Sequence, residues 1–435
     1  MKKSILSLTS AFLVAFSLNA QKVEFEEYDL SNGMHVILHQ DNSAPVVITS
    51  VMYGVGGKDG DRKRTGFAHF FEHLLFEGTE NIGRGEWMKI VSSNGGKVNA
   101  NTSQDRTYYY EIFPSNKLEL GLWLESARLL HPIIKQEGVD TQNEVIKEEK
   151  RQGTRAYSNI LPEISKNLFK VHPYKDPNIG HMEHLDAATL DEFLAFNKKY
   201  YVPNNATLVV AGDIDFASAK KMIKDYFEPI PRGAEVVRTF PTEEPITKEF
   251  KATAYDENIQ IPAVIAAYRT PSFKTRDSKV LDMISTYLSG GKSSILYKKM
   301  VDTKKMALAV QAVNISQQDY GIYALFSLPL GKVTLGDLIK EMDEEVLKIQ
   351  TDLISEKAFQ KIQNQFENNY VNSNSSVVGI ANSLARYNVM YGDTNLINSE
   401  IDIYRSITRE EIREAAKKYL NKNQRLILEY LPKKK

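Results

Sequence analysis

The stretch from Gly66 to Thr79 constrains this chain more than any other, because it combines an apolar run with polar groups at helical spacing. It contains His69, Glu72 and His73 in the pattern H-x-x-E-H, surrounded mainly by Phe and Leu. Residues four apart lie on the same face of an α-helix, so the two imidazoles can bind one metal ion. A helix this apolar is buried, where unpaired polar groups are costly. We therefore predict a buried helix that carries a metal site.

Glu72 follows His69 by three positions and so points towards the same face of the predicted helix. A carboxylate beside a metal can take a proton from water and produce a nucleophile at neutral pH. Two histidines do not complete a catalytic zinc site, which usually has three protein ligands. The helix-like run 141–151 contains several carboxylates, and we expect the third ligand there. The alternative is that both histidines are ordinary core residues, because such a pattern also occurs by chance.

The first 20 residues have the composition of a secretory signal peptide. Lys2 and Lys3 precede an apolar run from residue 5 to residue 18, and Ala20 ends the segment. We predict cleavage near Ala20–Gln21 and a periplasmic or secreted protein. An uncleaved membrane anchor is the alternative, although the run is short for a span. The chain has no cysteine, so a metal site must use histidine and carboxylate ligands.

Charge and length narrow the function and the organisation of the chain. Lysine plus arginine and aspartate plus glutamate balance at 55 each, which argues against nucleic acid as a partner. The 435 residues are enough for two domains with sizeable cores. The segment 229–245 is rich in proline and charge, which predicts an extended linker. We divide the chain into a signal peptide (1–20), an N-terminal metal-binding domain (21–228), a linker (229–246) and a C-terminal domain (247–435).

The second half of the chain repeats a pattern of the first. A predicted helix from Leu190 to Tyr201 and an apolar strand at 206–210 parallel a predicted helix from Arg409 to Leu420 and a strand at 424–428. The offset is about 218 residues, half the chain. Such a repeat predicts two homologous domains of mixed helices and strands, an α+β fold. The second copy has no H-x-x-E-H pattern, so it cannot bind metal in the same way.

These features resemble the pitrilysin/insulinase family of zinc peptidases, which includes the mitochondrial processing peptidase. The pattern H-x-x-E-H is the inverzincin signature. The resemblance extends to a Gly-Gly turn with its strand (94–103), to residues 172–180 and to residues 203–214, and covers most of 28–330. It implies a secreted zinc metalloendopeptidase that resembles the zinc-bearing subunit of bacterial relatives of the processing peptidase. Its two domains would form one half of a clamshell.

The resemblance also assigns the roles of the metal-site residues. The family's third ligand aligns with Glu149, so His69, His73 and Glu149 would hold one Zn²⁺ per chain and Glu72 would activate the water. Glu148 is the neighbour most easily confused with Glu149. Successive helix positions differ by about 100°, so only one of these two carboxylates can face the metal. Zinc is the default for this ligand set, although cobalt or manganese could fit.

Two further assignments concern the substrate and the surroundings of the metal. The strand at Val98, Asn99 and Ala100 is expected to pair with an extended peptide substrate through main-chain hydrogen bonds, which would make specificity loose. Gln142 stands where the family usually has an acidic residue that assists catalysis without binding the metal. Glutamine can form hydrogen bonds but carries no charge. We therefore expect reduced activity or an altered pH dependence.

The second half departs from the family at two positions. Active members often carry an Arg, and shortly after it a Tyr, that bind the substrate backbone and the transition state. Here Val301 and Leu308 occupy those positions, and no arginine lies between Arg276 and Arg386. The resemblance therefore implies a heterodimer in which a homologous partner subunit supplies the Arg/Tyr pair.

Two alternatives remain open at this point. In the first, the chain works as a homodimer and uses other donors, such as Tyr297, Lys298 or Lys299. In the second, it is a non-catalytic scaffold or binding subunit of the same fold, as some relatives in respiratory complexes are. Those relatives generally lose the metal motif, which is intact in this chain.

Overall fold

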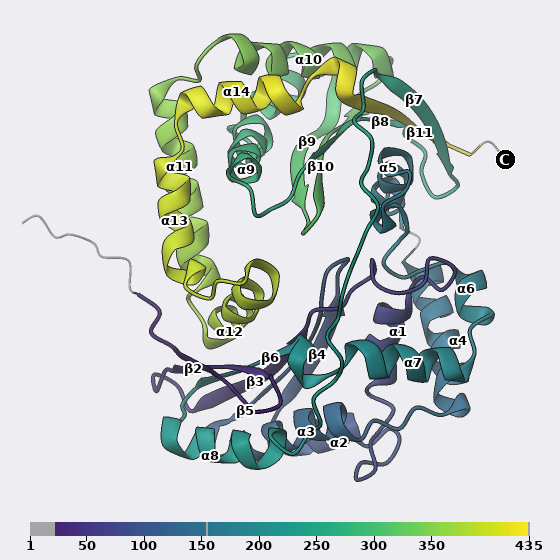
Figure 1. Cartoon of the computed structure of the whole chain (residues 1–435). Helices are drawn as coiled ribbons and strands as arrows, with labels where there is room; N and C mark the ends of the chain where they lie inside the picture. Colours follow the sequence, from purple (N-terminus) through teal and green to yellow (C-terminus); the bar gives the residue numbers. More distant parts are fainter. Residues whose placement is uncertain (1–21, 154, 434–435) are drawn as a thin grey trace, which may run out of the picture.

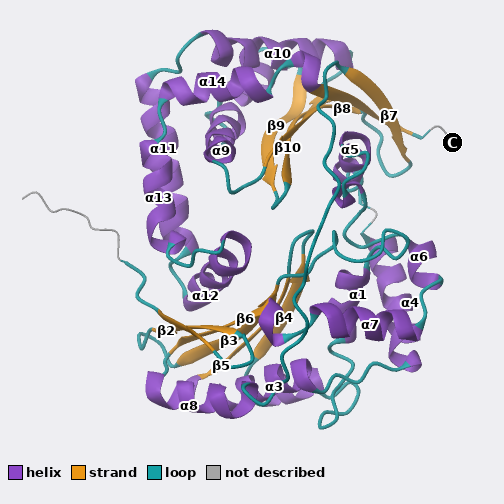
Figure 2. Ribbon diagram, viewed as in Figure 1, coloured by secondary structure: helices purple, strands orange, loops and turns teal. Residues whose placement is uncertain are grey.

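The computed structural model describes residues 22–153 and 155–433. Two β-sheets with their helices lie one above the other in the view of Figure 1, and Figure 2 shows the same arrangement by secondary structure. The predicted signal peptide lies outside the described residues. Within the described ranges, we find no helix with the length and apolar character needed to cross a membrane.

The N-terminal half contains a six-stranded sheet in the order β1-β2-β6-β3-β5-β4. Its strands are β1 (Glu26–Asp29), β2 (His35–Gln40), β3 (Val46–Tyr53), β4 (Lys97–Thr102), β5 (Thr107–Pro114) and β6 (Ala206–Gly212). Its helices are α1 (Phe67–Leu74), α2 (Trp87–Ser93), α3 (Leu118–Leu130), α4 (Gln136–Gln152), α5 (Ile160–Leu168), α6 (Met182–Asp186), α7 (Leu190–Tyr200) and α8 (Phe216–Phe227).

The C-terminal half contains a five-stranded sheet in the order β7-β11-β8-β10-β9. Its strands are β7 (Phe250–Asp256), β8 (Ala263–Pro271), β9 (Ala307–Ser316), β10 (Tyr320–Pro329) and β11 (Arg425–Pro432). Its helices are α9 (Arg276–Ser289), α10 (Leu335–Thr351), α11 (Glu356–Ser373), α12 (Val377–Arg386), α13 (Leu396–Ser406) and α14 (Arg409–Tyr419). Two π-helical turns, η4 (Tyr297–Thr303) and η5 (Tyr387–Tyr391), follow α9 and α12.

The two sheets have the same topology. When β2 to β6 are matched in order with β7 to β11, each strand has corresponding neighbours in both sheets. The pairs β2–β6 and β7–β11 are parallel, and the other pairs are antiparallel. Thr189 and Thr408 form equivalent capping boxes at the starts of α7 and α14. The predicted internal repeat of two α+β units is therefore confirmed, whereas the domain boundaries stay a prediction.

Each half packs one helix against the sheet of the other half. Ile164 and Leu168 of α5 lie in the core under the C-terminal sheet. Ile380 and Leu384 of α12 lie in the core on the N-terminal sheet, and Figure 1 shows helix α12 over that sheet. Both faces of each sheet are thus covered, which explains why β3 is buried along nearly all of its length. A cut at the linker would separate each of these helices from the sheet that it covers.

Asp319, in the turn between β9 and β10, pairs with Lys58 and so connects the two halves. Lys58 Nζ lies 3.0 Å from Asp105 Oδ1 and 2.8 Å from Asp319 Oδ2, and its side chain is almost fully buried. Nε2 of the buried His172 lies 3.4 Å from Asp319 Oδ2. Tyr174 donates a hydrogen bond to Asp105 Oδ1. Because these groups come from both halves, the cluster fixes the position of one sheet relative to the other.

The segment between α8 and β7 crosses both halves without helix or strand from residue 231 to residue 247. Arg238 Nε lies 2.6 Å from Asp59 Oδ1 of the N-terminal half. Glu243 accepts backbone hydrogen bonds from residues 170–172 and pairs with Arg269 Nη1 at 2.8 Å. The predicted linker is therefore held at two points along its length.

The substitution Asp319→Asn is expected to change how stability depends on pH. Burial raises the pKa of Asp319, but hydrogen bonds and charges from His172 and Lys58 outweigh it and hold the pKa at about 2. A folded pKa below the unfolded value adds stability that is present above about pH 4 and lost as the pH falls towards 2. In urea denaturation, the variant should therefore be less stable than the parent at pH 7, and the difference should narrow below pH 4. A constant difference across this range would contradict the expectation.

Candidate metal centre

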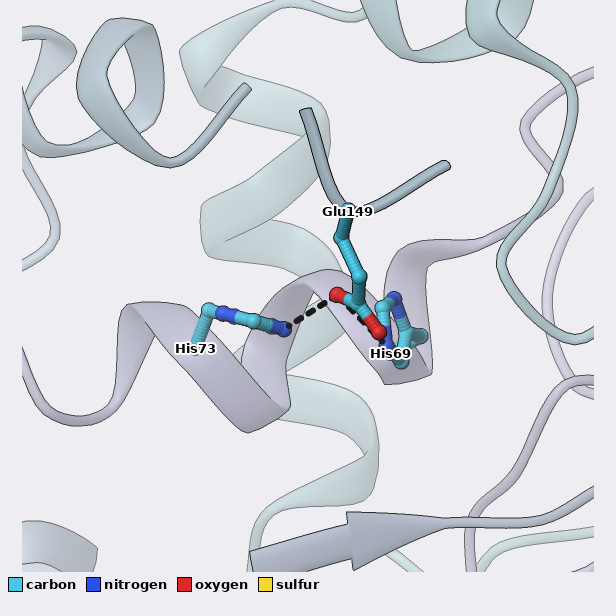
Figure 3. Close-up of side chains that lie close together, drawn as sticks. All are labelled: His69, His73 and Glu149. Atoms are coloured by element: carbon cyan, nitrogen blue, oxygen red, sulfur yellow. Dashed lines mark ion pairs between the residues drawn. The ribbon is translucent and has the colours of Figure 1, made fainter. Parts of the chain in front are cut away.

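The predicted metal-binding residues of α1 and α4 lie together. The rings of His69 and His73 lie along α1 with their centroids 5.0 Å apart. Glu149 reaches them from α4, which packs beside α1. Figure 3 shows its carboxylate between the two imidazole rings. Glu149 Oε2 lies 3.6 Å from His69 Nε2 and 3.3 Å from His73 Nε2. The ligand atoms of all three side chains lie within 4.8 Å of one another. Two histidines of α1 and one glutamate of α4 thus direct their ligand atoms towards one point.

Side chains from β5 and α3 donate hydrogen bonds to carbonyl oxygens at the C-terminal end of α1. Tyr109 donates from its hydroxyl to Phe71 O at 2.8 Å, and Arg128 Nη1 donates to Leu75 O, just after the helix, at 3.2 Å. The apolar face of the helix lies in the main core of the N-terminal half. Because polar and apolar contacts hold the same helix, the two imidazoles have little freedom to move apart.

A close backbone contact fixes the start of α1. Gly66, directly before the helix, has φ 92°, a conformation that glycine adopts without strain. A Cβ atom at Gly66 would lie 2.7 Å from Ile179 O, and one at Gly180 would lie 2.6 Å from Gly66 Cα. This contact holds the loop 176–179 against the metal-site helix, where it lines the cavity beside the ligands.

The electrostatics of the three side chains suit a metal ion. Burial, together with the charge of His69, lowers the pKa of His73. The hydrogen bond with His69, together with the charges of both imidazoles, lowers the pKa of Glu149. Neutral imidazoles and an ionised carboxylate are the forms that bind metals. Two histidine nitrogens and one carboxylate oxygen, open to a cavity, match the donor set of catalytic zinc sites, so these residues fit zinc.

A cavity of about 520 Å³ opens beside the three ligands. Its lining includes His69, Glu72 and Glu149, so Glu72 faces the same space as two of the ligands. Asn101 and Thr102 at the end of β4 form part of another wall. A carboxylate that is not in the ligand group but shares its cavity is placed to exchange a proton with a molecule bound there.

The cavity meets β4 at the C-terminal end of the strand, after the three residues that we expected to bind substrate. Val98 and Ala100 pack against the core, and Asn99 Oδ1 accepts a hydrogen bond from Ala100 N at 3.0 Å. None of these three residues is in the cavity lining, which begins at Asn101. β4 is nevertheless the edge strand of its sheet and pairs only with β5 among the described strands. Its free edge is therefore available for another strand.

Gln142 has a carboxylate as its neighbour. Its Nε2 donates a hydrogen bond to Glu77, which also pairs with Arg84. An acidic residue at position 142 would place two carboxylates against each other, and the amide avoids this repulsion. Glu77 follows His73 by four positions but lies beyond the end of α1 at Leu74, so helical spacing in the sequence did not indicate its place beside Gln142.

The donors considered for a homodimer lie in the turn η4, as does Val301, whereas Leu308 lies on β9. Lys299 is bound by carboxylates of α10: its Nζ lies 3.1 Å from Glu344 and 2.7 Å from Glu345. It also pairs with Glu341. A lysine held by three carboxylates is a poor donor to a substrate, which weakens the homodimer alternative.

Comparisons with known proteins place this site in a family. The profile of the family described as "Insulinase (Peptidase family M16)" matches residues 35–180, and that of the "Peptidase M16 inactive domain" matches residues 187–366. The chain belongs to peptidase family M16. His69, Glu72, His73 and Glu149 all fall in the first range. The description "inactive" falls on the range that lacks the H-x-x-E-H pattern.

Relatives and solved structures agree with this assignment over most of the chain. The zinc protease PqqE of Helicobacter pylori is 28% identical over 398 residues, which cover 88% of this chain and 89% of that protein. An uncharacterized zinc protease of Mycobacterium leprae is 24% identical over 401 residues, with coverage of 90% and 88%. The crystal structure of a protease from Helicobacter pylori matches with a TM-score of 0.87 at 25% identity, covering 94% of this chain and 99% of that one.

The fold also matches part of a longer protein. The first half of the periplasmic protease PqqL from Escherichia coli has a TM-score of 0.78 at 18% identity, with coverage of 94% of this chain and 92% of that fragment. At this identity the likeness shows the fold alone. The expected architecture, two repeated domains that form one half of a clamshell, is therefore confirmed.

Proposed function

We propose that this chain is a zinc-dependent endopeptidase that hydrolyses peptides or unfolded polypeptides. The observation that carries the proposal is the convergence of the His69, His73 and Glu149 ligand atoms within 4.8 Å, with Glu72 in the same cavity. These three side chains would hold one Zn²⁺ per chain. When bound, zinc polarises a carbonyl group and lowers the pKa of water. The names of the relatives, which are zinc proteases, support the same reading.

The chain's own groups then have distinct tasks. Glu72 accepts the proton of the attacking water and returns it to the departing amine. The free edge of β4, at Val98, Asn99 and Ala100, binds the main chain of an extended peptide. The side chain of Asn99 accepts a hydrogen bond from the Ala100 amide, so it must rotate away before a peptide can bind to that amide. The loop 176–179 closes one side of the cavity and limits access of bulk water.

The zinc content of two variants tests the ligand assignment. The parent should contain about one zinc per chain, and Glu149→Ala should lose it, because two histidines alone hold zinc weakly. Glu148→Ala is the matched control: its carboxylate binds Arg151 and Gln152 instead, so zinc should stay. Elemental analysis of the purified proteins gives the answer. Zinc retained after Glu149→Ala would show that another residue is the third ligand.

A non-catalytic scaffold or binding subunit is the second candidate function. The observation that favours it is the match of residues 187–366 to a domain described as inactive. A solved Pseudomonas fluorescens structure with a TM-score of 0.84 at 16% identity is also described as a peptidase M16 inactive domain. This candidate expects a parent protein without zinc that binds peptides and does not cleave them, so the same zinc measurement separates the two functions.

We also propose that a homologous partner subunit supplies an Arg/Tyr pair that this chain lacks at Val301 and Leu308. Loss of one donor to the transition state costs about 10²–10³ in rate, so cleavage by this chain alone should be weak. Addition of a family member that carries both residues, but no H-x-x-E-H, should raise the rate about a hundredfold. A fluorescent peptide assay against partner concentration measures this. Full activity without the partner would instead favour the homodimer.

The proposed location is the periplasm or the outside of the cell. The composition of residues 1–20 supports it. N-terminal sequencing of the exported protein tests cleavage at Ala20–Gln21. The substrate class is peptide, and the balanced charge speaks against nucleic acid.

A further inference from the structure

A second cavity of about 540 Å³ lies next to the metal-site cavity, between the two halves of the chain. Residues from the β4–β5 turn line one side, and residues of α9, α12 and the turn η5 line the other. Gln104 and Gln317 line both cavities. The two cavities therefore adjoin at these glutamines, and a path from the ligand group into the space between the halves would pass them.

Two guanidinium groups face this second cavity without a carboxylate partner. Arg106 Nη1 donates to Asn101 O at 2.8 Å, and Arg386 Nη2 donates to Tyr391 OH at 3.1 Å. Among the ion pairs of the described residues, neither arginine takes part. Burial lowers the pKa of Arg106, while the charges of Tyr108, Glu72 and Asp105 act in the opposite direction. Both guanidiniums belong to residues that line the same cavity. Two cations that line one cavity and form no ion pair favour an anion beside them.

The other charges that line the cavity have partners of their own. Lys279 pairs with Glu400, and Glu400 also accepts a hydrogen bond from Tyr387 at 2.5 Å. Asp282 accepts hydrogen bonds from Asn314 Nδ2 at 2.8 Å and Tyr404 OH at 2.9 Å. Burial raises the pKa of Asp282, which favours its uncharged form. Arg106 and Arg386 are thus the two cations of this lining that form no ion pair within the described part of the chain.

Unpaired acceptor atoms mark the path between the two cavities. Thr102 Oγ1, Gln104 Oε1 and Gln317 Oε1 are buried and have no hydrogen-bond partner in the described part of the chain. Buried polar atoms nearly always have a partner, so such a group of exceptions needs an explanation. These atoms are covered in the structure, so their side chains must rotate before the N–H groups of a bound peptide can satisfy them.

We propose that Arg106 and Arg386 bind a carboxylate of the peptide whose scissile bond lies at the metal centre. Tyr391 orients Arg386 for this contact. Guanidinium groups bind carboxylates through paired, charge-assisted hydrogen bonds, which give both affinity and direction. The inference rests on the proposed peptidase function and adds a substrate class: peptides with an acidic side chain or a free C-terminal carboxylate on one side of the cleaved bond.

Peptides of one length test the proposal in two pairs. The first pair has an amidated C-terminus and differs only in an internal glutamate or glutamine. The second pair contains the glutamine and differs only in a free or an amidated C-terminus. Binding to zinc-loaded Glu72→Gln protein is measured by fluorescence anisotropy, and cleavage is measured with the parent. The preferred carboxylate should strengthen binding about tenfold or more over its neutral counterpart. Comparison of the two pairs shows whether a side chain or the C-terminus supplies the carboxylate.

Variants assign the effect to the two arginines. Arg386→Gln and Arg106→Gln should each remove the preference for the acidic peptide while binding of the neutral peptide stays the same. Arg413→Gln, at an arginine on α14 paired with its neighbour Glu414, is the matched control and should keep the preference. Unchanged thermal melting and zinc content show that each variant is folded.

The outcomes separate this inference from the proposed function. Cleavage of acidic and neutral peptides at equal rates, with equal binding, would overturn the carboxylate site and leave the peptidase intact. A carboxylate preference in binding without any cleavage, even with the partner subunit in excess, would overturn the peptidase and leave the site intact. Weaker binding of all peptides alike in Arg386→Gln would show that this arginine has a structural role and would also overturn the proposal.

Discussion

Peptide cleavage by Glu72→Gln is expected to fall by about 10²–10⁴-fold, while zinc content and peptide binding stay as in the parent. Glutamine has nearly the same shape as glutamate, so the cavity wall and the fold are preserved. It cannot accept the proton of the attacking water, so the step that produces the nucleophile is lost. Because Glu72 is not in the group of ligand atoms, the metal site itself should not change.

The measurement is the initial rate of cleavage of a fluorescent peptide, with the partner subunit present in excess. Glu148→Gln serves as the control, because it makes the same chemical change on the neighbouring helix at a carboxylate that points to Arg151 and Gln152. Its rate should stay near that of the parent. Equal rates for Glu72→Gln and the parent would exclude Glu72 as the proton acceptor and reject the mechanism.

The metal-site helix could be predicted from sequence because its information is local. The spacing of His69 and His73 translates directly into a shared helix face, and the apolar neighbours show that the helix is buried. The third ligand could not be chosen in this way. Periodicity alone does not distinguish Glu144, Glu148 and Glu149, because the packing of α4 on α1 decides which carboxylate meets the histidines. The family resemblance supplied that choice.

Features set by tertiary packing were missed for the same reason. The apolar faces of α5 and α12 were visible in the sequence, but nothing local shows that each helix covers the sheet of the other half. The strand β4 was predicted, yet the cavity meets it at Asn101 and Thr102, because the loop 176–179 closes over that end. The pairing of Gln142 with Glu77 likewise depends on how α1 and α4 meet.

Arg128 stands out in the sequence as a charged residue in an apolar helix, but its contacts are known only from the structure. It is a single cation within the apolar helix Leu118–Leu130, and it is fully buried. Its Nη2 lies 2.9 Å from Glu111 Oε1 and 3.2 Å from Glu125 Oε1, and both carboxylates are fully buried too. The guanidinium also lies over the rings of Phe76, Trp87 and Tyr109, at 4.4, 4.1 and 4.5 Å from their centroids.

This cluster connects the core to the metal centre. One cation faces two carboxylates, and burial, strengthened by the charge of Glu125, raises the pKa of Glu111 well above its ordinary value. Arg128 therefore offsets part of the free-energy cost of burying these two acids. Its hydrogen bond to Leu75 O also holds the C-terminal end of α1, two residues after His73.

Replacement of Arg128 by leucine should lower the free energy of unfolding by about 3–5 kcal/mol, because it leaves two buried carboxylates without their cation. Arg405→Leu is the matched control: Arg405 also pairs with two carboxylates, Glu367 and Asp402, but on the surface, so its loss should cost less than about 1 kcal/mol. Urea denaturation at pH 7 measures both values.

The same variant separates a local effect on the metal centre from a global one. Without the hydrogen bond to Leu75 O, the end of α1 is released, so Arg128→Leu should bind zinc more weakly even in urea-free buffer, where most of the protein is still folded. Competition with a chelator measures the zinc affinity of the folded protein. Equal and small losses of stability in Arg128→Leu and Arg405→Leu, with zinc affinity unchanged, would show that the buried cluster neither stabilises the core nor holds α1 in place.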